Sequence, residues 1–182
     1  MDALTLQLVS TGAASVCAGI GSVHDLRERR IPNALTGPAI VAGLALHTAT
    51  GGFPGMGDAA AAGAIAGAAA LLFRLAGGMG AGDVKLMAAV GCIAGFAPLR
   101  LVLVATAFAG AIFAIAVSLR HRRLRSTLAN AGALLEYHSR HGLRPHPDFN
   151  LDNPAMLRLP FALPIAAGCL FALFTLAREV RK

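Results

Sequence analysis

The chain has 182 residues, of which 56% are hydrophobic and only 14% are charged, and its net charge is +7. A soluble domain carries about a quarter charged residues, so this composition excludes an ordinary soluble domain and indicates a protein whose solvent is lipid. The positive charge does not indicate nucleic-acid binding, because the basic residues lie in gaps between apolar runs, as topology signals do.

Six apolar segments follow one another along the chain, at about residues 3–23, 34–50, 59–76, 84–97, 99–119 and 159–177. We therefore predict an all-α fold, a polytopic membrane helix bundle of about six transmembrane helices that forms a single membrane-embedded domain over residues 1–182. A bilayer crossing takes roughly 20 helical residues, so the fourth segment is short. It either begins below the membrane surface or forms a re-entrant element.

The distribution of basic residues predicts which gaps between the segments face the cytoplasm. Twelve of the sixteen lie in the first, third and fifth gaps: Arg27, Arg29, Arg30, Arg74, Lys85, Arg120, Arg122, Arg123, Arg125, Arg140, Arg144 and Arg158. Under the positive-inside rule these gaps are cytoplasmic and the amino terminus is outside. The terminal Arg178, Arg181 and Lys182 would also lie outside and fit this orientation poorly, but they weigh less than three consistent gaps.

Asp25 directly follows the first apolar segment and opens the run DLRERRIPN. In this run Pro32 presets a turn or a helix start, and Asn33 can cap the next helix. One interpretation is that Asp25 balances the neighbouring arginines at an interfacial helix end. The other interpretation is that Asp25 has a functional role, because a carboxylate at membrane depth is costly and is a functional candidate by default.

A glycine-rich run, GGMGAGD, joins the third and fourth segments and ends at Asp83. Its glycines prevent a continuous helix and let the backbone approach a ligand or an extended peptide. A Walker loop would need Gly-Lys-Ser/Thr, and a dinucleotide fingerprint would need a soluble strand–helix–strand unit, so neither fits. A glycine hinge with Asp83 as an N-cap stays open. At a helix start the dipole favours an ionised Asp83 and burial favours a protonated one, and the sequence does not decide between them.

The charge pattern places Asp25 and Asp83 in gaps on the same side of the membrane, so a shared site is geometrically possible. Two carboxyls at one site cannot both ionise cheaply and would share one proton. Such a pair can cut a peptide bond with no cofactor, because one carboxylate activates water and the protonated partner polarises the carbonyl. We therefore predict that Asp25 and Asp83 form a catalytic pair.

Three stretches of the chain resemble the signature regions of type IV prepilin peptidases. They are Asp25 followed by RIPN, GMGAGDVKL at residues 78–86, and RLPFALPIAAG at residues 158–168. They occur in the expected order and cover most of the chain. The resemblance implies a membrane-embedded aspartyl endopeptidase of the glycine-x-glycine-aspartate type. Asp25 and Asp83 are then the catalytic pair, and the active-site loop backbone is formed by Gly78, Gly80 and Gly82.

The resemblance also implies a substrate and a location. Such an enzyme is a multi-pass protein of the bacterial inner membrane, and its active site faces the cytoplasm. There it removes a short basic leader from a prepilin whose hydrophobic helix lies in the membrane. Larger members carry an amino-terminal segment with paired CxxC motifs and an N-methyltransferase activity. Nothing here matches that segment, so we expect leader cleavage without methylation, as in the short enzymes that serve tight-adherence (Flp-type) pili.

The remaining titratable residues give no metal or cofactor signal. Cys17, Cys92 and Cys169 each lie inside an apolar segment and have no CxxC spacing, which fits inert small hydrophobic residues. The histidines of the predicted cytoplasmic loop, about residues 120–158, include His138, His141 and His146, which show no regular ligand spacing. Leucines at helical spacing in the same loop fit an interfacial amphipathic helix, which would guide substrate or lie against anionic lipid as a linker.

Two other classes of function compete with the peptidase. A small transporter or channel also uses acids at membrane depth and glycine-broken helices, but it often repeats them in both halves, and no second glycine–aspartate loop follows the fifth segment. A non-catalytic membrane subunit of a pilus or secretion assembly would use the same aspartates for packing or capping. Specific cleavage of a leader separates the enzyme from both.

Overall fold

The computed structural model describes residues 3–142, 144 and 160–180, and within these ranges it contains helices and no strands. The helices are α1 (Ala3–Glu28), α2 (Asn33–Leu75), α3 (Ala81–Ala94), α4 (Phe96–Arg120), α5 (Leu124–His141) and α6 (Ala162–Val180). The predicted all-α class is confirmed. Of the residues discussed above, His146, Arg158, Arg181 and Lys182 lie outside the described ranges.

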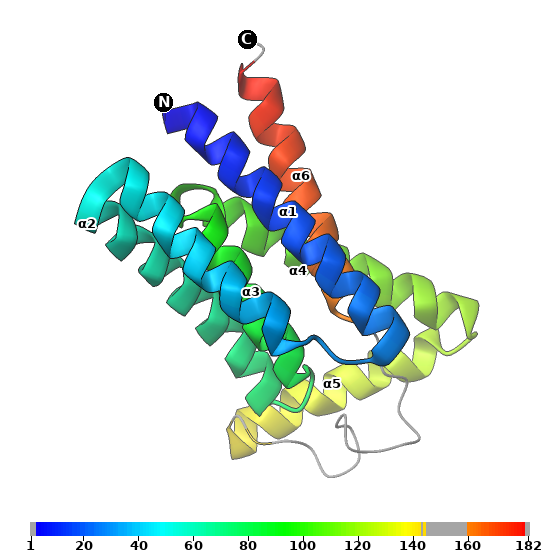
Figure 1. The fold of residues 1–182 in the computed structure, drawn as a ribbon. Coiled ribbons are helices and arrows are strands. Elements are labelled where there is room, and N and C mark those ends of the chain that lie inside the picture. The colour runs from blue at the N-terminus through cyan, green and yellow to red at the C-terminus, as the bar shows by residue number, and fades with distance from the viewer. Residues whose placement is uncertain (1–2, 143, 145–159, 181–182) are drawn as a thin grey trace.

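The second and third predicted segments are the two halves of α2, which folds back on itself. At the reversal Gly52 has φ 64° and ψ −153°, a conformation that is open essentially to glycine alone. The tight turn also needs Gly55, because a side chain there would collide with the backbone oxygen of His47. In Figure 1 the cyan first half of α2 therefore runs beside its teal second half. Hydropathy located both segments, but the connection between them is shorter than the predicted gap.

Among the described residues, four helices are long and apolar enough to cross a membrane: α1, α2, α4 and α6. The fourth predicted segment corresponds to α3, whose 14 residues place it outside this group and agree with its predicted shortness. Large apolar side chains cover the outside of the spanning helices, among them Val16, Val41, Phe108, Ile112 and Phe174. Such an exterior fits lipid as the surrounding solvent, and the fold is a polytopic helical bundle.

The contact between α2 and α3 is built from small residues. A Cβ added to Gly91 would lie 2.6 Å from the backbone oxygen of Ala62, and one added to Gly63 would collide with Cys92 Sγ. These distances require glycine and let the two backbones approach closely, which is how helices associate where lipid removes the hydrophobic driving force. His47 adds a polar contact, with its Nε2 3.0 Å from the carbonyl oxygen of Ile93.

The connections that carry the predicted signature residues lie at one end of the bundle. In Figure 1 the α1–α2 and α2–α3 connections lie at the end where α5 crosses, whereas the start of α1 and the end of α6 lie at the opposite end. The reversal within α2 makes this arrangement possible, because it returns the chain to the end from which α2 started. The candidate site is therefore assembled from two connections that are distant in the sequence.

Candidate active site

Asp25 lies in the last turn of α1, where α1 is hydrogen-bonded to the start of α6. Its carboxylate accepts a hydrogen bond from the backbone N–H of Ala162, the first residue of α6. One turn earlier, the hydroxyl of Ser22 donates to the carbonyl oxygen of the same Ala162 at 2.8 Å. Asp25 therefore faces the amino-terminal end of a helix, where the helix dipole favours a negative charge.

Asp83 is the third residue of α3 and is 92% buried, since only 8% of its surface is exposed. The N-cap is Gly80, which has an extended backbone, so Asp83 is not the cap that the hinge interpretation required. Instead the Asp83 carboxylate reaches back to the backbone N–H of Gly80. An acid at this position of a first turn normally makes this contact to the capping residue, and the contact fixes the side chain against the glycine loop.

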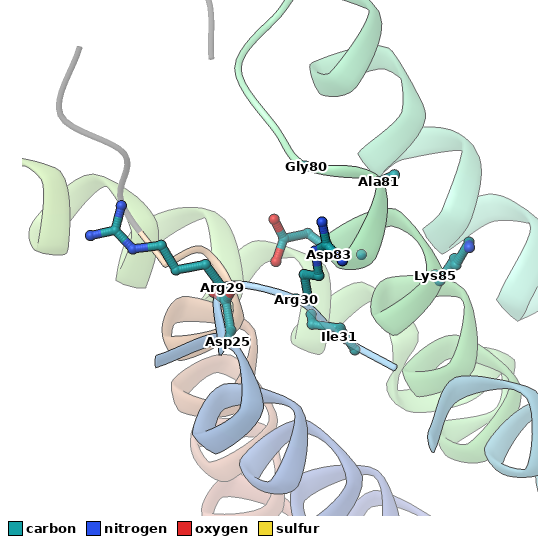
Figure 2. A pocket seen from close by; sticks show the side chains of 9 residues that line it. Asp25, Arg29, Arg30, Ile31, Gly80, Ala81, Asp83 and Lys85 are labelled. Carbon is teal, nitrogen blue, oxygen red and sulfur yellow. The ribbon is translucent and has the colours of Figure 1, made fainter. Parts of the chain in front are cut away.

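The two aspartates line one pocket of about 340 Å³ at the end of the bundle. Figure 2 shows Asp83 pointing from the start of α3 towards the end of α1 that carries Asp25. The complete lining is Asp25, Arg29, Arg30, Ile31, Gly80, Ala81, Gly82, Asp83 and Lys85. Each carboxylate keeps one buried oxygen, Oδ2 of Asp25 and Oδ1 of Asp83, that has no hydrogen-bond partner among the described residues. Two carboxyls thus face one small pocket, and each has a free oxygen.

The two acids of the pocket have different electrostatic surroundings. Burial, reinforced by the nearby charge of Asp25, raises the pKa of Asp83 from its ordinary value of 3.8 to about 6, and the Gly80 N–H opposes this rise only in part. Asp83 belongs to α3, whose 14 residues are fewer than those of the helices that are long and apolar enough to cross a membrane. Asp25 is less buried, and the backbone N–H of Ala162 and the Arg29 guanidinium lie near its carboxyl. Asp83, the more buried acid, therefore retains its proton above the ordinary range of an aspartate.

The glycine loop contributes two of its three predicted residues to the pocket. Gly80 and Gly82 line it, whereas Gly78 lies outside it and donates its N–H to the carbonyl oxygen of Phe73 at 3.0 Å. A Cβ on Gly82 would lie 3.1 Å from Cβ of Ile31, and one on Gly80 would lie 3.2 Å from Oδ2 of Asp83. The loop is therefore packed tightly where it touches the α1–α2 connection and the buried acid, and a side chain at either glycine would displace its neighbour by a few tenths of an ångström.

Basic residues around the pocket have roles that the sequence pattern did not specify. Lys85 does not pair with Asp83 but donates from Nζ to Oδ1 of Asn33 at 2.8 Å, which ties the start of α3 to the start of α2. Arg29 has φ 51°, a left-handed conformation that is uncommon outside glycine. It ends α1, with its N–H donating to the carbonyl oxygen of Asp25 at 3.0 Å, and turns the chain along the pocket.

No metal-binding set was found at the pocket or elsewhere in the described ranges, where no three His, Cys, Asp or Glu side chains gather around a common point. The cysteines Cys17, Cys92 and Cys169 are buried and free. His24, the neighbour of Asp25, turns away from the pocket, and its Nδ1 lies 3.0 Å from the carbonyl oxygen of Ile20. The charged and polar groups that line the pocket are two carboxyls, two glycine backbones and three cations.

The fold and the site together define a polytopic helical membrane protein with a paired-carboxyl pocket at one end of the bundle. The sequence model of the type IV leader peptidase family matches residues 13–115, which is more than half of the chain and includes both Asp25 and Asp83. The chain belongs to this family, and with it to the membrane-bound peptidases. No curated protein and no solved structure matches it.

Proposed function

We propose that the chain is an aspartic endopeptidase that removes the short basic leader from type IV prepilins of the tight-adherence (Flp-like) kind. The observation that supports this most directly is the pair of acids, Asp25 and Asp83, each with an unpartnered buried oxygen at one pocket. Membership of the type IV leader peptidase family supports the substrate class. Asp25 and Asp83 are the proposed catalytic residues, and Gly80 and Gly82 shape the loop that holds Asp83.

In the proposed mechanism Asp25 is the base and Asp83 is the acid. Asp25 takes a proton from water as the water oxygen bonds to the scissile carbonyl carbon, while the Asp83 proton hydrogen-bonds to the carbonyl oxygen. When the carbon–nitrogen bond breaks, Asp83 gives its proton to the leaving amine. The proton that Asp25 received then passes to Asp83, which restores the starting pair. The raised pKa of Asp83 supports this assignment, because a group that keeps its proton to about pH 6 can act as an acid near neutral pH.

The proposed setting is the cytoplasmic face of the bacterial inner membrane. The α1–α2 and α2–α3 connections and α5, which carry many of the basic residues, share the end of the bundle that carries the pocket, and the positive-inside rule assigns that end to the cytoplasm. A prepilin leader remains on that side, so its cleavage point would come to the level of Asp25 and Asp83. We propose hydrolysis without N-methylation, since the three cysteines are buried in helices and form no CxxC pair.

The test is leader removal by the purified protein in detergent, with a prepilin from a tight-adherence system as substrate. We expect the parent chain to cut at one bond and both Asp25→Asn and Asp83→Asn to lose at least about 10³-fold in rate, because Asn keeps the shape of Asp but cannot exchange a proton. Asp58→Asn is the matched control, because Asp58 is exposed on α2 and does not line the pocket. With S-adenosylmethionine present, mass spectrometry should show an unmethylated product.

Three outcomes would contradict the proposal. Normal cleavage by either Asn variant would remove that aspartate from the catalytic pair. Failure of the folded parent chain to cut any prepilin would favour the non-catalytic subunit. Proton or cation flux through vesicles containing the parent chain, lost in both Asn variants, would favour the transporter.

A further inference from the structure

Helix α5 exposes an apolar face that the rest of the described chain does not cover. None of its residues is buried, and Leu128 and Leu135 are 61% and 75% exposed. These leucines are seven residues apart and therefore lie on the same side of the helix. Most helical stability in proteins comes from packing of an apolar face. The apolar face of α5 is therefore available to a partner other than the described part of the chain.

The turn between α4 and α5 determines where α5 lies relative to the end of α4. Arg122 has φ 54°, and the next residue, Arg123, donates its N–H to the carbonyl oxygen of Ser118 at 2.8 Å. The hydroxyl of Ser118 in turn donates to Oγ1 of Thr127 at 3.1 Å, which ties the two helices together across the turn. α5 consequently leaves α4 at once and crosses the end of the bundle (Figure 1). Since α4 is long and apolar enough to cross a membrane, α5 would begin where α4 emerges from the bilayer.

The charge on and around α5 selects the surface that it contacts. Between residues 120 and 144 there is one acidic residue, Glu136, and its carboxylate is paired with Arg140 at 2.7 Å. The arginines of the same stretch are Arg120, Arg122, Arg123, Arg125, Arg140 and Arg144. An anionic membrane surface attracts each such cation by about 1 kcal/mol. A basic leader peptide would be repelled, so the charge favours the bilayer over the substrate.

We propose that α5 is an interfacial helix that inserts the face carrying Leu128 and Leu135 among the headgroups of anionic lipids, in the bilayer that α4 crosses. Its exposed leucines, the tight turn at Arg122 and the excess of arginine support this role independently of the peptidase chemistry. The helix then lies flat beside the end of the bundle that holds the pocket, and it anchors the long connection between α4 and α6 to the membrane.

Because the chain contains no tryptophan, a single introduced tryptophan reports on the surroundings of α5 by its fluorescence. Leu128→Trp places a single tryptophan on the proposed lipid face, and Ala133→Trp places it on the opposite, exposed face. The full chain is reconstituted into vesicles of phosphatidylcholine, with or without phosphatidylglycerol, whose acyl chains are brominated near the headgroup. Bromine quenching should be at least about twofold stronger for Leu128→Trp than for Ala133→Trp. It should increase with phosphatidylglycerol and decrease when Arg123 and Arg125 are both changed to Gln.

Equal quenching of the two tryptophans, or quenching of Leu128→Trp by aqueous acrylamide and not by brominated lipid, would overturn the proposal. So would an emission change of Leu128→Trp that follows addition of a basic leader peptide and is indifferent to lipid charge, because the face would then bind substrate. Each variant must retain the helical circular dichroism of the parent chain. Retention ensures that a negative result reflects where α5 lies and not a loss of folding.

Discussion

At the scale of single residues, the position of Asp83 depends on two glycines. Gly80 caps α3 without a side chain, and its N–H binds the Asp83 carboxylate, which leaves the second oxygen of Asp83 free in the pocket. Gly82 lets the start of α3 lie against Ile31 of the α1–α2 connection. The glycine run therefore has a structural purpose beyond flexibility, because it brings the helix that holds one acid against the connection that follows the other.

Gly82→Ala tests this arrangement. Its new methyl group would lie 3.1 Å from Cβ of Ile31, so the start of α3 must shift by a few tenths of an ångström or more. Small displacements of catalytic groups cost rate, and we expect leader cleavage to fall by about tenfold to a hundredfold while the protein still inserts. Gly132→Ala on α5 is the control, because a Cβ there meets nothing within 4 Å. If the two variants cleave equally fast, the contact between Gly82 and Ile31 does not position Asp83.

At the scale of helices, α2 and α3 approach each other closely at small residues. Gly91 lies against the backbone of Ala62, and Gly43 lies against the backbone of Cys92. Because α3 carries Asp83, this interface also determines where that acid stands. The structure shows which partner each of these glycines meets.

Gly91→Ala should therefore destabilise the protein. The added Cβ would lie 2.6 Å from the Ala62 carbonyl oxygen, and because the obstacle is backbone, the two helices must separate. We expect a loss of about 1–3 kcal/mol, the usual cost of overpacking. The measurement is loss of helical circular dichroism during denaturation in detergent. Gly57→Ala on α2 is the matched control, since a Cβ there meets nothing within 4 Å. A Gly91→Ala protein no less stable than Gly57→Ala would show that the close contact is dispensable.

At the scale of the whole molecule, the sequence predicted the features that lipid imposes. Apolar runs located the helices, because a segment in a bilayer must be long, apolar and internally hydrogen-bonded. The positions of arginine and lysine predicted that Asp25 and Asp83 lie on one side, and the structure places them at one pocket. Segment lengths were also informative for α3, whose shortness was visible in the hydropathy pattern.

Other parts of the molecule could not be predicted, because backbone groups make them. The donor to Asp25 is the N–H of Ala162, and a backbone N–H leaves no mark in the residue type. Likewise the cap of α3 is a glycine, so the capping pattern pointed to Asp83 instead of Gly80. The reversal of α2 depends on φ 64° at Gly52, one of several glycines in that stretch, and nothing in the composition distinguishes it from its neighbours.

The central claim is that the two carboxyls interact at one site, and the titration of Asp83 tests it most directly. With ¹³C-carboxyl aspartate in the full chain, the resonance missing from Asp83→Asn identifies Asp83. In the parent chain it should keep its proton until about pH 6. The negative charge of Asp25 helps to hold that proton, so we predict that Asp25→Asn lowers the pKa of Asp83, while burial keeps it above the ordinary 3.8. An Asp83 titration that is the same in Asp25→Asn and in the parent chain would show that the two carboxyls do not interact.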